Sequence, residues 1–176
     1  MDKLKIMIVD DNYLSAEGIE KNIDWETLNA EIIHVCYNGT SAIEAMKKEP
    51  ADLIISDIEM PDLDGISMSR QALEINPMVK IILISAYDKF EYARRALLLG
   101  ALDYIEKPLD YAYLIQQVKN AFALMEKEQK NLQLLKQSRP LLTEKFFREI
   151  THLPSSEAAY RLKPYLKYLH LELHYD

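Results

Sequence analysis

The 176-residue chain has one cysteine, four glycines and seven prolines, and its acidic residues outnumber its basic ones. The single Cys36 cannot form a disulfide within the chain, and its position in an apolar run predicts a buried small side chain. So few glycines and prolines argue against a low-complexity or disordered protein. The formal net charge of -7 argues against direct binding of a nucleic-acid backbone by this chain.

Long hydrophobic runs are also missing from the sequence. No apolar run reaches the ~18 residues that a membrane span needs. Residues 1–5 lead directly into a strand pattern and lack the layout of a signal peptide. We therefore expect a cytoplasmic protein without a membrane partner. Hydrophobic residues make up 49% of the chain, which is enough for the core of one domain plus an extension.

Strand and helix patterns alternate along the first two thirds of the chain. Short runs rich in isoleucine, leucine and valine predict strands that are buried on both faces. Asn12 is predicted to cap the first helix, prolines follow the second and third helices, and Gly100 is the C-cap candidate of the fourth. The predicted strands cover residues 5–9, 32–36, 53–56, 80–84 and 102–105.

This alternation with short connections predicts an α/β fold. The expected architecture is flavodoxin-like and doubly wound, with a five-stranded parallel sheet of strand order 2-1-3-4-5 and helices on both faces. We assign residues 1–125 to this domain.

An extended C-terminal helix is predicted from Asp110 to about Ser138, because this stretch contains neither glycine nor proline. Pro140 is predicted to end it. The first half of the helix is expected to pack on the sheet. A heptad seam runs along the whole helix. Its members are Leu114, Val118, Ala121, Met125, Glu128, Leu132 and Leu135.

The seam suggests a role for the second half of this helix. We expect residues 126–139 to be a helical linker that pairs with a partner helix as a coiled coil, and a solvated linker is the alternative. Residues 140–176 carry many tyrosines and leucines, and we expect them to be the start of a further module that is truncated in this chain.

Polar residues gather where the predicted strands end. In an open α/β sheet, the carboxyl ends of the strands form the edge at which ligands bind. Each signal is weak alone, because an acidic pair is often a helix cap and a lone aspartate is often a turn residue. The argument depends on all of them falling at one edge. The residues are Asp10, Asp11, Asp57, Ser85, Tyr104 and Lys107.

The residue types at this edge predict phosphoryl chemistry. Three converging carboxylates, Asp10, Asp11 and Asp57, suit Mg²⁺, which prefers oxygen ligands and keeps several waters. Mg²⁺ neutralises and orients a phosphoryl group, so Asp57 is expected to be the group modified. Lys107 can pair with phosphoryl oxygens as a point charge, and Ser85 can donate a hydrogen bond to one.

Residues 3–125 resemble the receiver domain of two-component response regulators. The matching stretches are residues 6–11, 52–61, Gly65, 82–87 and 100–108.

The resemblance implies a role for each residue of the site. It implies that Asp57 is the phosphoacceptor, that Asp11 binds Mg²⁺ directly, that Asp10 acts mostly through water, and that the backbone carbonyl of Glu59 completes the ligand set. It further implies that Ser85 and Lys107 contact the phosphoryl group. It implies that Tyr104 is the aromatic residue that turns inward when Ser85 moves. It also places Glu59 and Tyr87 at the rim of the site, and it implies a cis peptide bond before Pro108.

Residues 23–26, 85–93 and 140–146 resemble the subset of regulators whose output is an AraC-type helix-turn-helix domain. The resemblance implies a phosphorylation-dependent switch that is driven by a sensor histidine kinase and regulates transcription. DNA binding would belong to an output domain that this chain does not contain. The resemblance also allows a homodimer through the face of the fourth and fifth helices or through the extended helix.

Two alternatives stay open. The chain could be a stand-alone phosphorelay receiver without an output domain. It could instead be an enzyme, a phosphatase of the haloacid dehalogenase type, which also uses aspartate, Mg²⁺, serine or threonine, and lysine. In that enzyme class the nucleophile follows the first strand in an Asp-x-Asp pattern, and Asn12 stands where the second aspartate is needed. We therefore expect a regulatory phosphoacceptor that turns over no metabolite.

Overall fold

The computed structural model describes residues 3–86 and 90–150, with the side chains of the last helix described as far as residue 134. By its internal contacts, the chain divides into two units, residues 1–124 and 125–176. The candidate site lies in the first unit.

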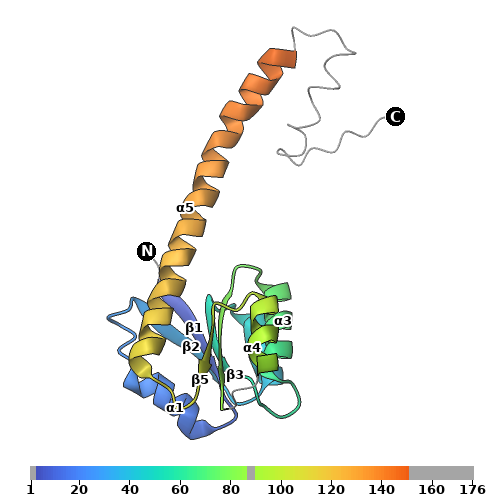
Figure 1. Cartoon of the computed structure of the whole chain (residues 1–176). Coiled ribbons are helices and arrows are strands. Elements are labelled where there is room, and N and C mark those ends of the chain that lie inside the picture. Colours follow the sequence, from blue (N-terminus) through green and yellow to red (C-terminus); the bar gives the residue numbers. More distant parts are fainter. Residues whose placement is uncertain (1–2, 87–89, 151–176) are drawn as a thin grey trace. The chain divides into compact units, whose positions relative to one another are not determined.

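A five-stranded sheet forms the centre of the first unit, with strand order β2-β1-β3-β4-β5 (Figure 1). Every neighbouring pair of strands is parallel. The predicted fold class and strand order are therefore confirmed. The strands are β1 (Leu4–Val9), β2 (Ala30–Cys36), β3 (Leu53–Asp57), β4 (Lys80–Ser85) and β5 (Asp103–Glu106).

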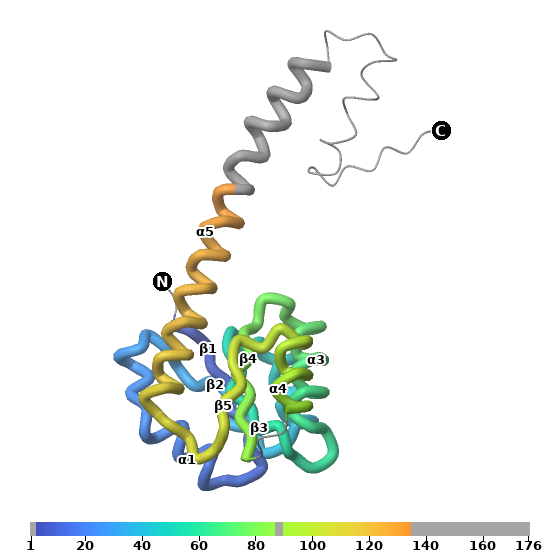
Figure 2. Tube along the Cα trace, in the orientation of Figure 1, coloured from blue at the N-terminus to red at the C-terminus, as the bar shows by residue number. Residues whose placement is uncertain are grey.

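Helices cover both faces of this sheet. In Figures 1 and 2, α3 and α4 lie on one face, and α1 and the beginning of α5 lie on the other. This doubly wound arrangement leaves the carboxyl ends of the strands open to ligands. The helices are α1 (Tyr13–Asn22), α2 (Gly39–Lys48), α3 (Gly65–Ile75), α4 (Phe90–Leu99) and α5 (Tyr111–Ile150).

Several turns of the fold have clear local causes. The Asn12 side chain accepts the backbone N–H groups of Leu14 and Ser15, which confirms it as the N-cap of α1. Asp64 caps α3 in the same way. Gly100 follows α4 with a φ of +83°, a conformation that glycine adopts at little cost.

The central strands are buried on both faces. Ile8 in β1, Ile55 in β3 and Leu83 in β4 are completely buried, as expected for a parallel sheet that is covered by helices on both sides. This packing gives the strand ends fixed positions, so functional side chains placed there are held on a rigid support.

The last helix is longer than the sequence predicts. α5 continues through Pro140 to Ile150, so the prediction that the helix ends before this proline is wrong (Figure 1). Proline removes one backbone donor and disfavours an interior helical position. Residues 141–150 nevertheless contain no glycine or further proline and include several strong helix formers, which favour continuation. No helix in the described part of the chain is both long and apolar enough to cross a membrane.

Candidate functional site

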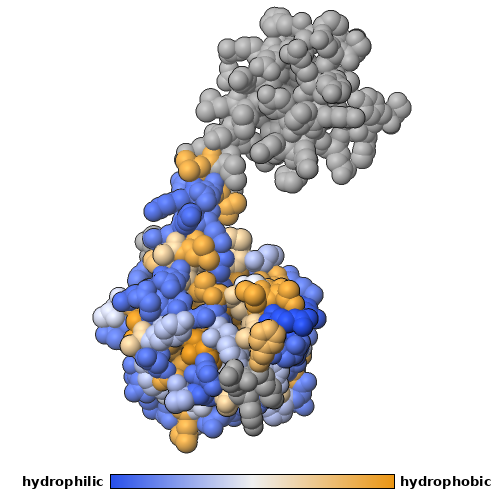
Figure 3. Space-filling model, in the orientation of Figure 1, coloured by the Kyte–Doolittle hydropathy of each residue, from blue (hydrophilic) through white to orange (hydrophobic). Residues whose placement is uncertain are grey.

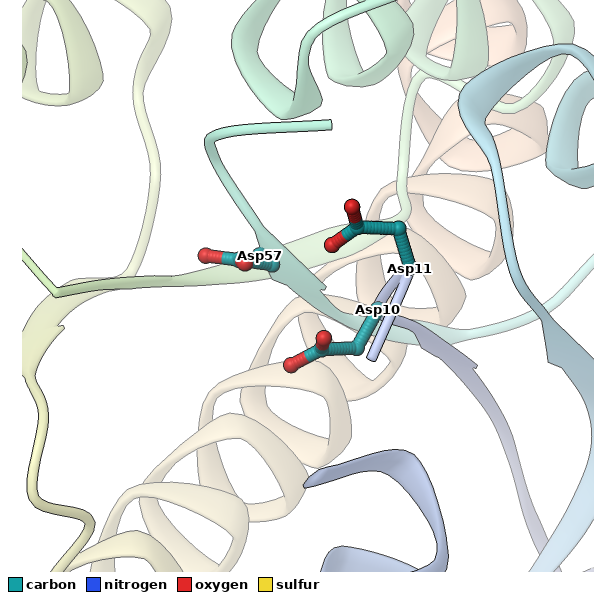
Figure 4. Close-up of side chains that lie close together, drawn as sticks. All are labelled: Asp10, Asp11 and Asp57. Carbon is teal, nitrogen blue, oxygen red and sulfur yellow. The ribbon is translucent and has the colours of Figure 1, made fainter. Parts of the chain in front are cut away.

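Three carboxylates converge at the ends of β1 and β3 (Figure 4). Asp10 and Asp11 follow β1 directly, and Asp57 is the last residue of β3. β1 and β3 are parallel neighbours, and Val9 lies opposite Ser56. The residues that follow these two, Asp10 and Asp57, therefore lie beside each other. One oxygen from each of the three carboxylates lies within 4.8 Å of the other two. Asp10 and Asp57 are buried and Asp11 is exposed, so the cluster opens to solvent on one side.

Backbone groups orient the two buried carboxylates. The N–H of Asn12 donates to Asp10 Oδ1 at 2.8 Å. The N–H of Ile58 donates to Asp57 Oδ1 at 2.9 Å. Each carboxylate therefore has one oxygen fixed by the chain, and its second oxygen, Oδ2, is left for other partners.

Lys107 supplies that partner for both carboxylates. It follows β5 directly, and its Nζ lies 3.0 Å from Asp10 Oδ2 and 3.2 Å from Asp57 Oδ2. Its backbone N–H donates to the carbonyl oxygen of Ser85 at 2.8 Å, which continues the pairing of β4 and β5. The peptide bond between Lys107 and Pro108 is cis.

The charges in this cluster shift two pKa values. Burial raises the pKa of Asp57 above its usual range, and the carboxylate of Asp10 adds to this, although the ammonium of Lys107 opposes it. Burial lowers the pKa of Lys107, but the hydrogen bond that its ammonium donates to Asp10 and the charges of both carboxylates outweigh this effect, and the pKa is raised. Lys107 therefore stays charged, and an ionised Asp57 costs free energy.

The switch residues that the sequence suggests lie on the two neighbouring strands. Ser85 is the buried last residue of β4, and Asp57 is aligned with the residue before it, Ile84. Tyr104 lies in β5 opposite Leu83 and packs, half-buried, against the hydrophobic core. Tyr87 lies outside the described residues.

The structure adds two features that the sequence analysis did not assign to the site. A Cβ atom on Gly65 would lie 2.0 Å from the carbonyl oxygen of Asp57, so a side chain at this position would collide with the backbone of the acceptor. The hydroxyl of Tyr92 in α4 donates to Glu59 Oε1 at 3.1 Å. Gly65 can be identified in the sequence as a glycine next to Asp64. No local pattern connects Glu59 with Tyr92, which is 33 residues away.

The family of the chain follows from comparison with known proteins. Residues 6–119 match the model of the response regulator receiver domain. This match spans more than half of the chain, and it includes the carboxylates, Lys107 and all five strands except the beginning of β1. The chain belongs to the receiver domain family of response regulators, whose members act as phosphorylation-dependent signalling switches.

Individual relatives agree with this assignment. The chain is 29% identical over 124 residues to an uncharacterised transcriptional regulatory protein, YesN, of Bacillus subtilis, covering 70% of this chain and 34% of YesN. It is similar in structure to the receiver domain of AraT, a response regulator from Geobacillus stearothermophilus, with 34% identity and a TM-score of 0.68, covering 73% of this chain and 99% of that one.

A third relative was solved with bound ligands. It belongs to the CheX-CheY-BeF3-Mg complex from Borrelia burgdorferi, with 29% identity and a TM-score of 0.62, covering 68% of this chain and 89% of that one. That complex contains Mg²⁺ and BeF3. The chain itself spans half or less of the length of the curated transcriptional regulators that it matches.

Proposed function

We propose that Asp57 accepts a phosphoryl group from a sensor histidine kinase and that its phosphorylation controls a transcription-regulating output domain. The observation that carries this proposal is the meeting of three carboxylates and Lys107 at one sheet edge, with Asp57 at the end of a central strand. The family assignment favours this switch over a phosphatase of the haloacid dehalogenase type.

The donor set fits Mg²⁺. All three side chains offer carboxylate oxygens, no histidine or cysteine is among them, and exposed Asp11 leaves room for the waters that Mg²⁺ keeps. We assign Asp11 and Asp57 as direct ligands, Asp10 as a ligand mainly through water, and the backbone carbonyl of Glu59 as the remaining protein ligand. When bound, the ion neutralises charge on the carboxylates and on the incoming phosphoryl group. The relative that was solved with Mg²⁺ supports this assignment.

The residues of the site have distinct parts in the transfer. An oxygen of ionised Asp57 attacks phosphorus, an O–P bond forms, the P–N bond of the phosphohistidine breaks, and its electron pair returns to the imidazole nitrogen. Ile58 N–H holds Oδ1 and Lys107 holds Oδ2, and we assign the attack to Oδ2, because its contact with the lysine side chain can be exchanged whereas Oδ1 is tied to the backbone. Lys107, which contacts Oδ2 at 3.2 Å, is placed to exchange this contact for the phosphoryl oxygens.

Ser85 and Tyr104 are assigned to the response. Ser85, adjacent to Asp57 across β3 and β4, would move toward the phosphoryl group to donate a hydrogen bond. This movement would leave space that Tyr104 fills by turning inward against the core that it already contacts. Such a change would alter the surface formed by α4, β5 and the start of α5.

That surface is suited to self-association. Figure 3 shows hydrophobic side chains on the surface over α4, where Phe90, Leu97 and Leu98 are 75–80% exposed. Exposed apolar patches of this kind often mark interaction sites. We propose a homodimer that uses this face or the extended helix, in a cytoplasmic regulator whose DNA contacts come from an AraC-type output domain outside this chain. The names of its relatives as transcriptional regulators support this role.

Mass spectrometry after incubation with acetyl phosphate tests the acceptor. We expect one phosphoryl group to be added at Asp57 only when Mg²⁺ is present, because its charge is needed to bring an anionic donor to a carboxylate cluster. Asp57→Asn should remove the label. Asp62→Asn, which removes an exposed carboxylate in the following loop, is the matched control and should keep the label. Labelling that persists in a chelator, or that maps to another residue, would contradict the proposal.

A further inference from the structure

The loop that carries Glu59 is fixed at the backbone. Ile58 N–H donates to the carbonyl oxygen of Ile84 in β4 at 2.9 Å, and Gly65 N–H donates to the carbonyl oxygen of Ile58 at 2.9 Å. Glu59 follows Ile58 and stands two residues beyond Asp57. Its backbone position is therefore set by the sheet and by α3, and the position of its carboxylate depends on its side-chain torsions and on the groups that contact it.

Tyr92 selects one of those side-chain positions. Its hydroxyl donates to Glu59 Oε1 at 3.1 Å, a hydrogen bond to a charged acceptor. The tyrosine ring is half-buried and packs against the hydrophobic core. This packing restrains the ring and therefore the position of the hydroxyl group. Tyr92 lies in the first turn of α4, which begins at Phe90, and the hydrogen bond therefore directs the carboxylate toward α4.

The position of this carboxylate matters because the site is already rich in negative charge. Asp10, Asp11 and Asp57 bring three carboxylates together, and Lys107 contacts two of them. An incoming phosphodonor is also anionic. If the Glu59 carboxylate lay near Asp57, it would repel the phosphodonor. This repulsion depends on the distance between the two negative charges, so a small shift of the carboxylate changes it.

We propose that Tyr92 is a positioning residue for phosphoryl transfer, which holds the carboxylate of Glu59 toward α4 and away from the path of the donor to Asp57. The inference rests on the proposed function of Asp57 as acceptor. It gives α4 a direct connection to the rim of the site, separate from the one through Ser85 and Tyr104.

The experiment compares rates of phosphorylation by acetyl phosphate with Mg²⁺ in the full 176-residue chain. Tyr92→Phe keeps the ring but loses the donor, and we expect the second-order rate constant to fall about three- to tenfold at low ionic strength. The loss should shrink as salt is added, since screening weakens repulsion between exposed charges. Tyr113→Phe is the matched control, because it deletes another tyrosine-to-carboxylate hydrogen bond, to Asp103 at 2.7 Å, and it should leave the rate unchanged.

The same substitution in a Glu59→Gln variant distinguishes positioning of the Glu59 carboxylate from a general structural effect of Tyr92→Phe. In Glu59→Gln the backbone carbonyl is kept and the charge is removed, so adding Tyr92→Phe should no longer slow the reaction. If Tyr92→Phe slows phosphorylation equally in both backgrounds, or has the wild-type rate, the positioning role is overturned. Absence of label on Asp57 in the wild-type chain would instead overturn the proposed function itself.

Discussion

At the scale of single residues, Asp57 combines a buried position with a charge. Burial raises its pKa in the folded protein, and the nearby carboxylate of Asp10 adds to this against the opposing effect of Lys107. Between the pKa of the unfolded chain and this higher value, the folded protein binds more protons than the unfolded one. Stability contributed by Asp57 is therefore present at low pH and is lost as the pH rises through this window.

Removal of this charge should stabilise the protein at neutral pH. We expect Asp57→Asn to raise the melting temperature at pH 7 in a chelator, by about 2–4 °C for each kcal/mol that the buried charge costs. The difference should vanish below the ordinary pKa range of aspartate, where Asp57 is neutral in both states. Thermal unfolding followed by circular dichroism from pH 3 to 8 measures it.

The control for this prediction is Asp62→Asn, which removes an exposed carboxylate in the loop that follows β3. A lower melting temperature for Asp57→Asn at pH 7 would mean that the attraction of Lys107 outweighs the cost of burial. Added Mg²⁺ should stabilise the wild-type chain more than Asp57→Asn, since the variant lacks one proposed ligand.

At the scale of elements, the junction of β3 and α3 depends on a glycine. A Cβ atom at Gly65 would lie 2.0 Å from the carbonyl oxygen of Asp57, and this obstacle is backbone that cannot rotate away. We expect Gly65→Ala to destabilise the domain by about 1–3 kcal/mol, the range of an overpacked site, and to slow phosphorylation of Asp57. Urea denaturation measures the first effect.

Gly18→Ala offers a contrast within α1. Its added Cβ would lie 2.8 Å from the hydroxyl of Tyr111, which is the end of a side chain and can shift. This variant should therefore cost less than Gly65→Ala. Equal losses would show that the β3–α3 junction can relax and that the glycine is not required by the acceptor.

The helix α5 divides into two parts with different surroundings. Leu114, Val118 and Ala121, the first three members of the heptad seam, are buried in the first unit, which confirms that this half packs on the sheet. Leu132, further along the seam, is 48% exposed. The second half therefore has apolar side chains available for a partner helix, as the seam predicts.

Self-association through this seam should be sensitive to charge. We expect Leu132→Lys to weaken dimerisation of the phosphorylated chain at least tenfold, because a lysine would have to be buried against the partner helix. Gln133→Lys introduces the same charge one residue away, outside the seam, and should have little effect. Sedimentation equilibrium of both variants measures the difference, and equal effects would place the dimer contact elsewhere.

At the scale of the whole molecule, the net charge of -7 opposes contact with nucleic acid. Binding to DNA requires several clustered lysines and arginines that neutralise phosphates, and its strength falls steeply with salt. Here basic and acidic residues alternate, as in residues 126–128. We expect no sequence-specific DNA binding by this chain, phosphorylated or not. Fluorescence anisotropy at low salt measures this, and tight, selective binding would contradict it.

Local sequence signals are sufficient to predict the sheet, its strand order and the edge that carries the site. These follow from local signals, since runs of Ile, Leu and Val predict buried strands and Asn12 predicts a helix start. Once the strands are known to be parallel, Asp10, Asp11 and Asp57 must end at the same edge. The end of α5 does not follow from the local sequence, because Pro140 lowers helix propensity without excluding a helix.

Contacts between distant parts of the chain depend on tertiary packing and do not follow from local signals. Lys107 reaches Asp10 across 97 positions and bridges it to Asp57, whereas the sequence predicted only a contact with a phosphoryl group. Tyr92 meets Glu59 across 33 positions, and Gly65 passes the backbone of Asp57 where no side chain fits. Such contacts depend on how helices pack against the sheet, to within an ångström. Residue types and their spacing indicate the periodicity of each helix and strand. The distances between side chains on different elements are set only when the elements pack around a common core.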